Sequence, residues 1–129
     1  MRPSIQHKNL GFTLIELLVV LAIVALLTTI TLPRYFQSID KGKEAVLAEN
    51  LRITRECIDK FVGDTGRYPE SLEELVEKKY LKQVPIDPIT ESATTWLLVA
   101  PDEGKAGMVF DLHSGAPGNK SDGTPFSAL

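Results

Sequence analysis

The sequence predicts an α+β protein with one long N-terminal helix and a small mixed head. Helical signals run without a break from Phe12 to about Val62, first as a largely apolar stretch and then as an amphipathic pattern. Two β-prone runs follow in the C-terminal third, separated by a loop of turn-forming residues. The 129 residues allow one domain of ordinary size and exclude a large multidomain enzyme.

Residues 12–32 are the apolar part of this helix and are long enough to cross a membrane. At about 1.5 Å per residue they extend roughly 31 Å, close to a hydrocarbon thickness of about 30 Å. Glu16 is their only ionisable side chain. The threonine hydroxyls at positions 28, 29 and 31 can bond to carbonyl oxygens of the preceding turn. The alternative, a buried helix of a soluble protein, would need more surrounding protein than the remaining chain can supply.

The residues before this segment predict its orientation. Arg2, His7 and Lys8 precede the apolar stretch, and basic residues favour the cytoplasmic side of a membrane. Everything after Pro33 would then lie outside the cytoplasm. Small residues typical of a secretory cleavage site do not follow the apolar stretch, so we expect the segment to be retained.

The helical pattern continues beyond Pro33 into the more polar part of the chain. One apolar stripe consists of Leu47, Leu51, Ile58, Phe61 and Val62. Pro33 removes one main-chain hydrogen bond, which predicts a kink there. The glycines of residues 63–66 are expected to end the helix.

A short second helix is expected after Ser71. Its hydroxyl can cap the helix start, and Glu74 can complete a capping box. Residues 94–100 and 108–112 are β-prone and predict an antiparallel hairpin, since residues 101–107 are rich in turn formers. The glycines and prolines of residues 113–129 predict an irregular C-terminal loop.

A specific motif opens the apolar helix. Residues 11–16 read Gly-Phe-Thr-Leu-Ile-Glu after a short basic leader, and this combination resembles the class III signal of type IV prepilins and type II secretion pseudopilins. The resemblance implies that a membrane-embedded prepilin peptidase cuts between Gly11 and Phe12 and methylates the new amine of Phe12. It divides the chain into a cytoplasmic leader that is removed (1–11), a transmembrane and assembly helix (12–33) and a periplasmic head (34–129).

Glu16 is a candidate functional residue because an ionised carboxylate inside a bilayer is costly unless it is paired. The resemblance implies that it pairs with the N-terminal amine of a neighbouring subunit as a fibre assembles, and that Pro33 belongs to the same assembly helix. The alternative is that Glu16 reaches the lipid headgroups from near the helix start. Both interpretations stay open.

The head resembles the major pseudopilin of type II secretion more than a type IV pilin, in residues 66–69, 85–88 and 110–115. The resemblance implies a type IV pilin-like fold and a single-pass protein of the cell inner membrane that moves into a periplasmic pseudopilus to drive export of folded proteins. Implied partners are copies of itself, minor pseudopilins, and the inner-membrane assembly platform with its ATPase. The alternative is a type IV pilus (minor) pilin or a membrane-tethered binding module.

The resemblance also implies a calcium ion in the C-terminal loop, although no cofactor is expected to be required. Oxygen ligands for calcium could come from Ser114, Asn119 and Asp122. Pro117 occupies the position nearest the family's expected aspartate. We therefore favour an apolar attachment, in which Phe126 packs on the hairpin near Trp96 or Phe110.

The remaining composition argues against catalysis and nucleic-acid binding. Asp111 and His113 would face one side of a strand and Ser114 the other, so they do not predict a hydrolase triad. The net charge is -3, and 12 bases minus 17 acids gives -5 after loss of the leader, which disfavours nucleic acid. Cys57 is the only cysteine and is expected to pack rather than to react.

Overall fold

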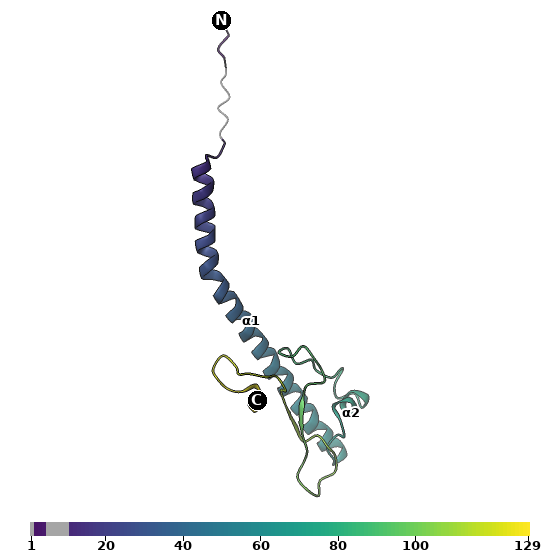
Figure 1. The fold of residues 1–129 in the computed structure, drawn as a ribbon. Helices are drawn as coiled ribbons and strands as arrows, with labels where there is room; N and C mark the ends of the chain where they lie inside the picture. The colour runs from purple at the N-terminus through teal and green to yellow at the C-terminus, as the bar shows by residue number, and fades with distance from the viewer. Residues whose placement is uncertain (1, 5–10) are drawn as a thin grey trace. The chain divides into compact units, whose positions relative to one another are not determined.

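The computed structural model describes residues 2–4 and 11–129. The element order is helix α1 (Leu14–Thr65), helix α2 (Leu72–Glu77), strand β1 (Leu97–Val99), strand β2 (Asp111–His113) and the 3-10 helix η1 (Phe126–Ala128) (Figure 1). This order confirms the predicted α+β fold class. The chain divides into two compact units between Gln37 and Ser38.

Helix α1 has 52 residues and continues through Pro33. It ends three residues later than expected, because Gly63 lies inside the helix and Gly66 ends it. Gly66 has a φ of 77°, in the left-handed region, and its N–H donates to the Val62 carbonyl at 2.8 Å. The kink expected at Pro33 stays a prediction.

Within the first unit, the threonine hydroxyls behave as expected for a helix in lipid. Thr28 Oγ1 donates to the Val24 carbonyl at 2.6 Å, and Thr29 Oγ1 donates to the Ala25 carbonyl at 2.8 Å. These bonds satisfy the hydroxyls inside the helix itself, so no water is needed to satisfy them.

The predicted stripe forms the helical wall of the head core. Its buried members are Leu47, Leu51, Ile58 and Phe61. Thr54 is also fully buried on this face, although its polarity gave no reason to expect it. Its hydroxyl donates to the Asn50 carbonyl at 2.7 Å, which satisfies the buried group and permits its place in the core.

Helix α2 begins as predicted, but only half of the expected capping box forms. Ser71 Oγ accepts the Glu74 N–H at 3.2 Å. The Glu74 carboxylate lies 2.6 Å from Arg67 Nη2, and its Oε2 accepts the N–H of Glu70 at 3.5 Å. It therefore contacts the residue before the cap, and the N–H of Ser71 is not its partner.

The hairpin is antiparallel as predicted, with Leu98 opposite Leu112, but its strands are shorter than the β-prone runs. The second strand begins three residues after Met108. Met108 and Val109 both donate their N–H groups to the Pro69 carbonyl, at 3.0 and 2.9 Å, instead of joining the ladder. This alternative partner delays the start of β2.

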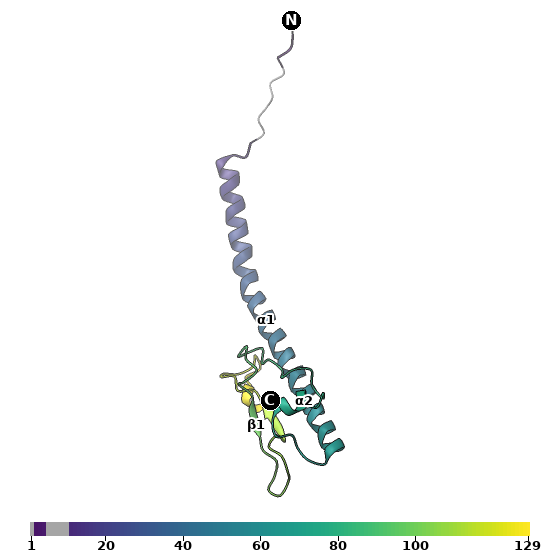
Figure 2. The ribbon, with the colours of Figure 1, turned by 90° about the vertical axis from the view of Figure 1, so that its right-hand side faces the viewer.

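The tail is mostly irregular, as expected, but it ends in η1, which the sequence did not predict. Figure 2 shows this yellow C-terminal segment in the head, and η1 lies next to β2. Phe126 is buried in the same core cluster as Trp96, one of the two partners expected for it. Phe110 is about half exposed and instead pairs edge-on with Tyr68, with ring centroids 5.5 Å apart.

Candidate functional site

The expected cleavage site precedes the regular structure of the chain. Gly11 and Phe12 lie just before α1, and Phe12 is 88% exposed. An added Cβ at Gly11 would meet nothing within 4 Å, so the main chain there is open to an approaching enzyme. His7 and Lys8 of the predicted leader lie outside the described residues. Cleavage between Gly11 and Phe12 stays a prediction.

Glu16 closes the N-terminus of its own helix. The Glu16 N–H donates to Thr13 Oγ1, and the Thr13 N–H donates to Glu16 Oε2, each at 3.2 Å. This reciprocal pair is a capping box, and the Thr-x-x-Glu spacing is the sequence signal that predicts it. The helix dipole also favours a carboxylate at this end.

The capping box gives Glu16 a neutral partner, and the residues that the structure describes give it no cationic one. Among residues 2–4 and 11–129, none of the ion pairs involves Glu16. Its Oε2 accepts a neutral N–H, which satisfies hydrogen bonding but does not neutralise the charge. Cleavage after Gly11 would create an amine at Phe12 and leave the Thr13 N–H intact. The capping box and a pairing with another chain's amine are therefore compatible.

The surface of α1 that follows Glu16 is apolar and uncovered. The helix contains a segment long and apolar enough to cross a membrane, and none of that segment is buried within the chain. Leu18 and Leu26 are 58% and 63% exposed. This exposure is typical of a membrane-spanning helix and differs from that of a buried core helix.

The three candidate calcium ligands are engaged with different partners. Ser114 is fully buried, and its hydroxyl donates to Asp87 Oδ2 at 2.6 Å. Asn119 forms an isolated β-bridge with Pro125. Asp122 Oδ1 accepts the Thr124 N–H at 2.9 Å, and this bond holds the pKa of Asp122 below its usual value. The calcium site stays a prediction.

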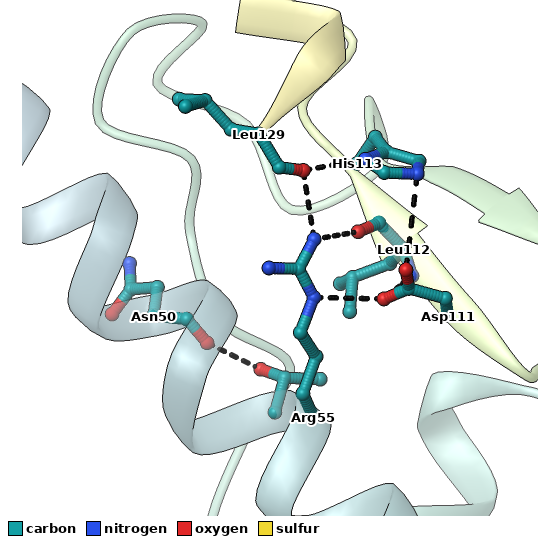
Figure 3. A network of polar contacts seen from close by, with 7 residues as sticks. Asn50, Arg55, Asp111, Leu112, His113 and Leu129 are labelled. Carbon is teal, nitrogen blue, oxygen red and sulfur yellow. Dashed lines mark hydrogen bonds and ion pairs between the residues drawn. The ribbon is translucent and has the colours of Figure 1, made fainter.

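The end of the C-terminal tail, residues 113–129, is held by residues that are far apart in the sequence. The sequence did not predict these contacts. Arg55 of α1 donates from Nε to Asp111 Oδ1 at 2.7 Å, and from Nη2 to the carbonyl of Leu112 at 2.9 Å and the main-chain oxygen of Leu129 at 2.7 Å (Figure 3). His113 Nδ1 bonds to the same Leu129 oxygen. We call these five residues the tail network.

The side chains of Asp111, His113 and Ser114 do not form a hydrolase triad. Asp111 and His113 lie on one face of β2, with His113 Nε2 3.8 Å from Asp111 Oδ2. The Ser114 hydroxyl points away and donates to Asp87. The predicted alternation of these side chains is confirmed, and the imidazole of His113 is not the partner of the serine hydroxyl.

Cys57 packs as expected. The thiol is half-buried and donates to the Tyr80 carbonyl at 3.1 Å. Burial raises the pKa of the thiol above its usual value, so less of the reactive thiolate is present near neutral pH.

Comparison with known proteins finds similarity both at the N-terminal motif and over most of the chain. Residues 6–32 match the family described as prokaryotic N-terminal methylation motif. The chain is 30% identical over 132 residues to the type II secretion system core protein G of Pseudomonas aeruginosa, covering 89% of each protein. It is 28% identical to the protein of the same name from Escherichia coli, covering 85% of this chain and 83% of that protein.

A pilin is similar over a shorter part. The type IV major pilin protein PilA of Myxococcus xanthus is 31% identical over 68 residues, covering 53% of this chain and 31% of that protein. No solved structure gives a significant match. The similarity to the core proteins extends through the head, whereas the similarity to the pilin covers about half of the chain.

Proposed function

The chain belongs to the family of type II secretion system core protein G, and on this premise we propose that it is the structural subunit of a periplasmic pseudopilus. In this proposal residues 1–11 are removed by a prepilin peptidase and Phe12 is methylated. Residues 12–33 anchor the chain in the inner membrane with the head, residues 34–129, in the periplasm. Copies then leave the membrane and polymerise, and growth of the fibre drives export of folded proteins.

The observation that carries the proposal is the uncovered apolar surface of α1. A long apolar helix is stable in lipid, and it is equally stable where identical helices cover one another. A fibre built from such helices removes the same apolar area from water that the membrane did. Transfer from membrane to fibre therefore requires little net change in apolar burial, which suits a subunit that moves between both states.

Glu16 supplies the polar part of the assembly. Its carboxylate is held at the start of α1 by Thr13 and lacks a cationic partner among the described residues. In the fibre, the amine of Phe12 from a neighbouring copy would neutralise it. An unpaired charge in an apolar assembly is strongly unfavourable, so this pair would specify how one copy is placed against the next.

The partners follow from this cycle. The peptidase processes the chain, and the inner-membrane platform with its ATPase supplies the work of assembly. Minor pseudopilins would start the fibre. The charge of -5 after processing, from 12 bases minus 17 acids, argues against DNA as a ligand of the head. No catalytic step is assigned to the chain.

A direct test compares stoichiometry. The gene is expressed in a bacterium whose type II secretion machinery lacks its own core protein G. The outer membrane is then removed, and the proteins of the released periplasmic fibres are quantified by mass spectrometry. We expect this chain to be the dominant protein of the fibres and to restore export. Recovery as a rare copy within fibres of another pilin would contradict the proposal and favour a minor pilin or a tethered binding module.

A further inference from the structure

The C-terminal tail has little regular structure of its own, yet most of it is ordered against the head. Its last helix, η1, contains three residues, and the preceding turn is closed by the bridge between Asn119 and Pro125. Phe126 provides an apolar attachment in the core. A segment with so few internal bonds needs further contacts to offset the conformational entropy lost on ordering it.

Two side chains of α1 supply such contacts. Glu44 accepts the N–H and the hydroxyl of Ser121, at 2.7 and 3.0 Å, and the end of the tail is held by Arg55. Its planar guanidinium reaches three acceptors, one on each of Asp111, Leu112 and Leu129 (Figure 3). Arg55 is separated by 56 residues from Asp111 and by 74 from Leu129. One side chain thus joins α1, β2 and the end of η1, which are remote in sequence.

Two of the three oxygen atoms that accept hydrogen bonds from Arg55 also accept a second hydrogen bond. Asp111 Oδ1 accepts the Leu112 N–H at 2.8 Å in addition to Arg55 Nε. The Leu129 oxygen receives both Arg55 Nη2 and His113 Nδ1, so the His113 tautomer must carry its proton on Nδ1. The side chains of Arg55 and Asp111 are 37% and 27% exposed, which shields this pair better than the exposed pairs of α1.

The residues expected to bind calcium do not fit the ion. Calcium takes six to eight oxygen ligands and favours several carboxylates. The Ser114 hydroxyl is committed to Asp87, and the ammonium of Lys120 lies 3.8 Å from Asp122 Oδ2. In the described part of the chain, no three His, Cys, Asp or Glu residues are grouped as metal ligands. A cation at Asp122 would be repelled by Lys120, and the neighbouring Glu44 carboxylate already accepts the Ser121 N–H and hydroxyl, at 2.7 and 3.0 Å.

We propose that the tail network holds the C-terminal tail in the role for which a calcium ion was expected, and that the head keeps its structure without a metal. Arg55 is the central residue, because it alone contacts the helix, the strand and the tail end. A guanidinium is suited to this role, since its fork of donors is rigid and remains charged at any pH the protein meets.

Thermal unfolding of the full chain in detergent tests the proposal. The single tryptophan, Trp96, is buried in the head core, and its fluorescence reports the head. The melting temperature is measured in calcium chloride and in the chelator EGTA. We expect the two values to agree within about 1 °C, because a ligand that does not bind the folded state cannot stabilise it.

Two arginines of the same helix provide matched variants. Arg55→Ala should lower the melting temperature by about 4–8 °C, and trypsin should then cut after Lys120 several-fold faster. Arg52→Ala removes exposed ion pairs within α1 and should shift the melting temperature by no more than about 1 °C. If Arg55→Ala does not fold, Arg55→Lys decides, because it keeps the charge and loses the fork.

Two results would overturn the proposal. The first is a rise of several degrees in wild-type melting temperature with calcium that disappears in Asp122→Ala. The second is Arg55→Ala or Arg55→Lys melting like wild type and leaving Lys120 equally protected from trypsin. Destabilisation by both Arg55 variants together with an unchanged wild type in EGTA would support it.

Discussion

Glu16 combines two interactions that different substitutions can separate. Its carboxylate completes a capping box with Thr13, which is a matter of hydrogen bonding within one chain. It also carries a negative charge, which in the proposed fibre is a matter of pairing between chains. A glutamine at this position retains an oxygen acceptor for the Thr13 N–H and removes the charge.

We expect Glu16→Gln to be inserted and cleaved normally and yet to assemble as poorly as Glu16→Ala. An amine left unpaired in the fibre should cost about 3–5 kcal/mol, well above the roughly 1 kcal/mol of a helix cap. The amount of fibre released from the periplasm after removal of the outer membrane measures assembly. Thr13→Ala is the matched control, because it removes the cap and keeps the charge. Normal fibre yield from Glu16→Gln would assign Glu16 to capping alone.

Cys57 offers a second prediction at the same scale. Because burial raises the pKa of its thiol, the thiolate that reacts with iodoacetamide should form at higher pH in the folded chain than in the unfolded chain. Alkylation of the native protein should therefore be many-fold slower near pH 8, and its rate should keep rising above the pH of about 8.5 where a free thiol half-titrates. Equal rates in native and denatured chain would contradict the packing role.

At the scale of elements, the hairpin depends on one close approach. Gly107 has a φ of 105°, and a Cβ there would lie 2.1 Å from the Tyr68 carbonyl oxygen. This contact brings the loop after β1 against residues 68–69, where the Pro69 carbonyl takes the N–H groups of Met108 and Val109. The start of β2 is set by this packing.

Gly107→Ala should therefore be much more damaging than Gly104→Ala. Both glycines have positive φ, but an added Cβ at Gly104 meets nothing within 4 Å. We expect Gly104→Ala to cost about 1–2 kcal/mol of unfolding free energy from backbone strain alone, and Gly107→Ala to cost more than about 3 kcal/mol from strain and overlap together. Urea unfolding followed by Trp96 fluorescence compares them. Equal losses would show that the approach to Tyr68 is not required.

The elements differ in how far the sequence could predict them. The stripe of Leu47, Leu51, Ile58 and Phe61 repeats at helical spacing, so helix and core face follow from local pattern. The antiparallel hairpin was predictable, but the ends of its strands were not. The carbonyl of Pro69, in another segment, accepts the N–H groups of Met108 and Val109 that could have joined the ladder. The spacing of apolar residues shows which face of a helix or strand is buried. It does not show which other segment packs or bonds there.

The candidate functional residues also fall into those that the sequence could predict and those that it could not. The short motif around Gly11 and Glu16 is contiguous, so it was recognisable from sequence. The tail network joins residues up to 74 positions apart, and Arg55 differs from its exposed neighbour Arg52 only by which side of the helix it occupies. That distinction required the position of β2 and the tail, which no local pattern contains.

At the scale of the whole molecule, the proposal requires one chain to be stable in two surroundings. The exposed apolar side chains of α1 need lipid before assembly and other copies of α1 afterwards. The head keeps its own core in both states, because its buried residues lie between Ser38 and the C-terminal tail. In the proposal, processing precedes the transfer to the fibre, because an amine at Phe12 would exist only after cleavage.

The most direct test is the intact mass of the subunit extracted from fibres released from the periplasm, measured from cells with and without the prepilin peptidase. With the peptidase, the chain in the fibres should lack residues 1–11 and carry one additional methyl group. Without it, the chain should remain full-length in the inner membrane and no fibres should form. Fibres built from the full-length, unmethylated chain would contradict the account.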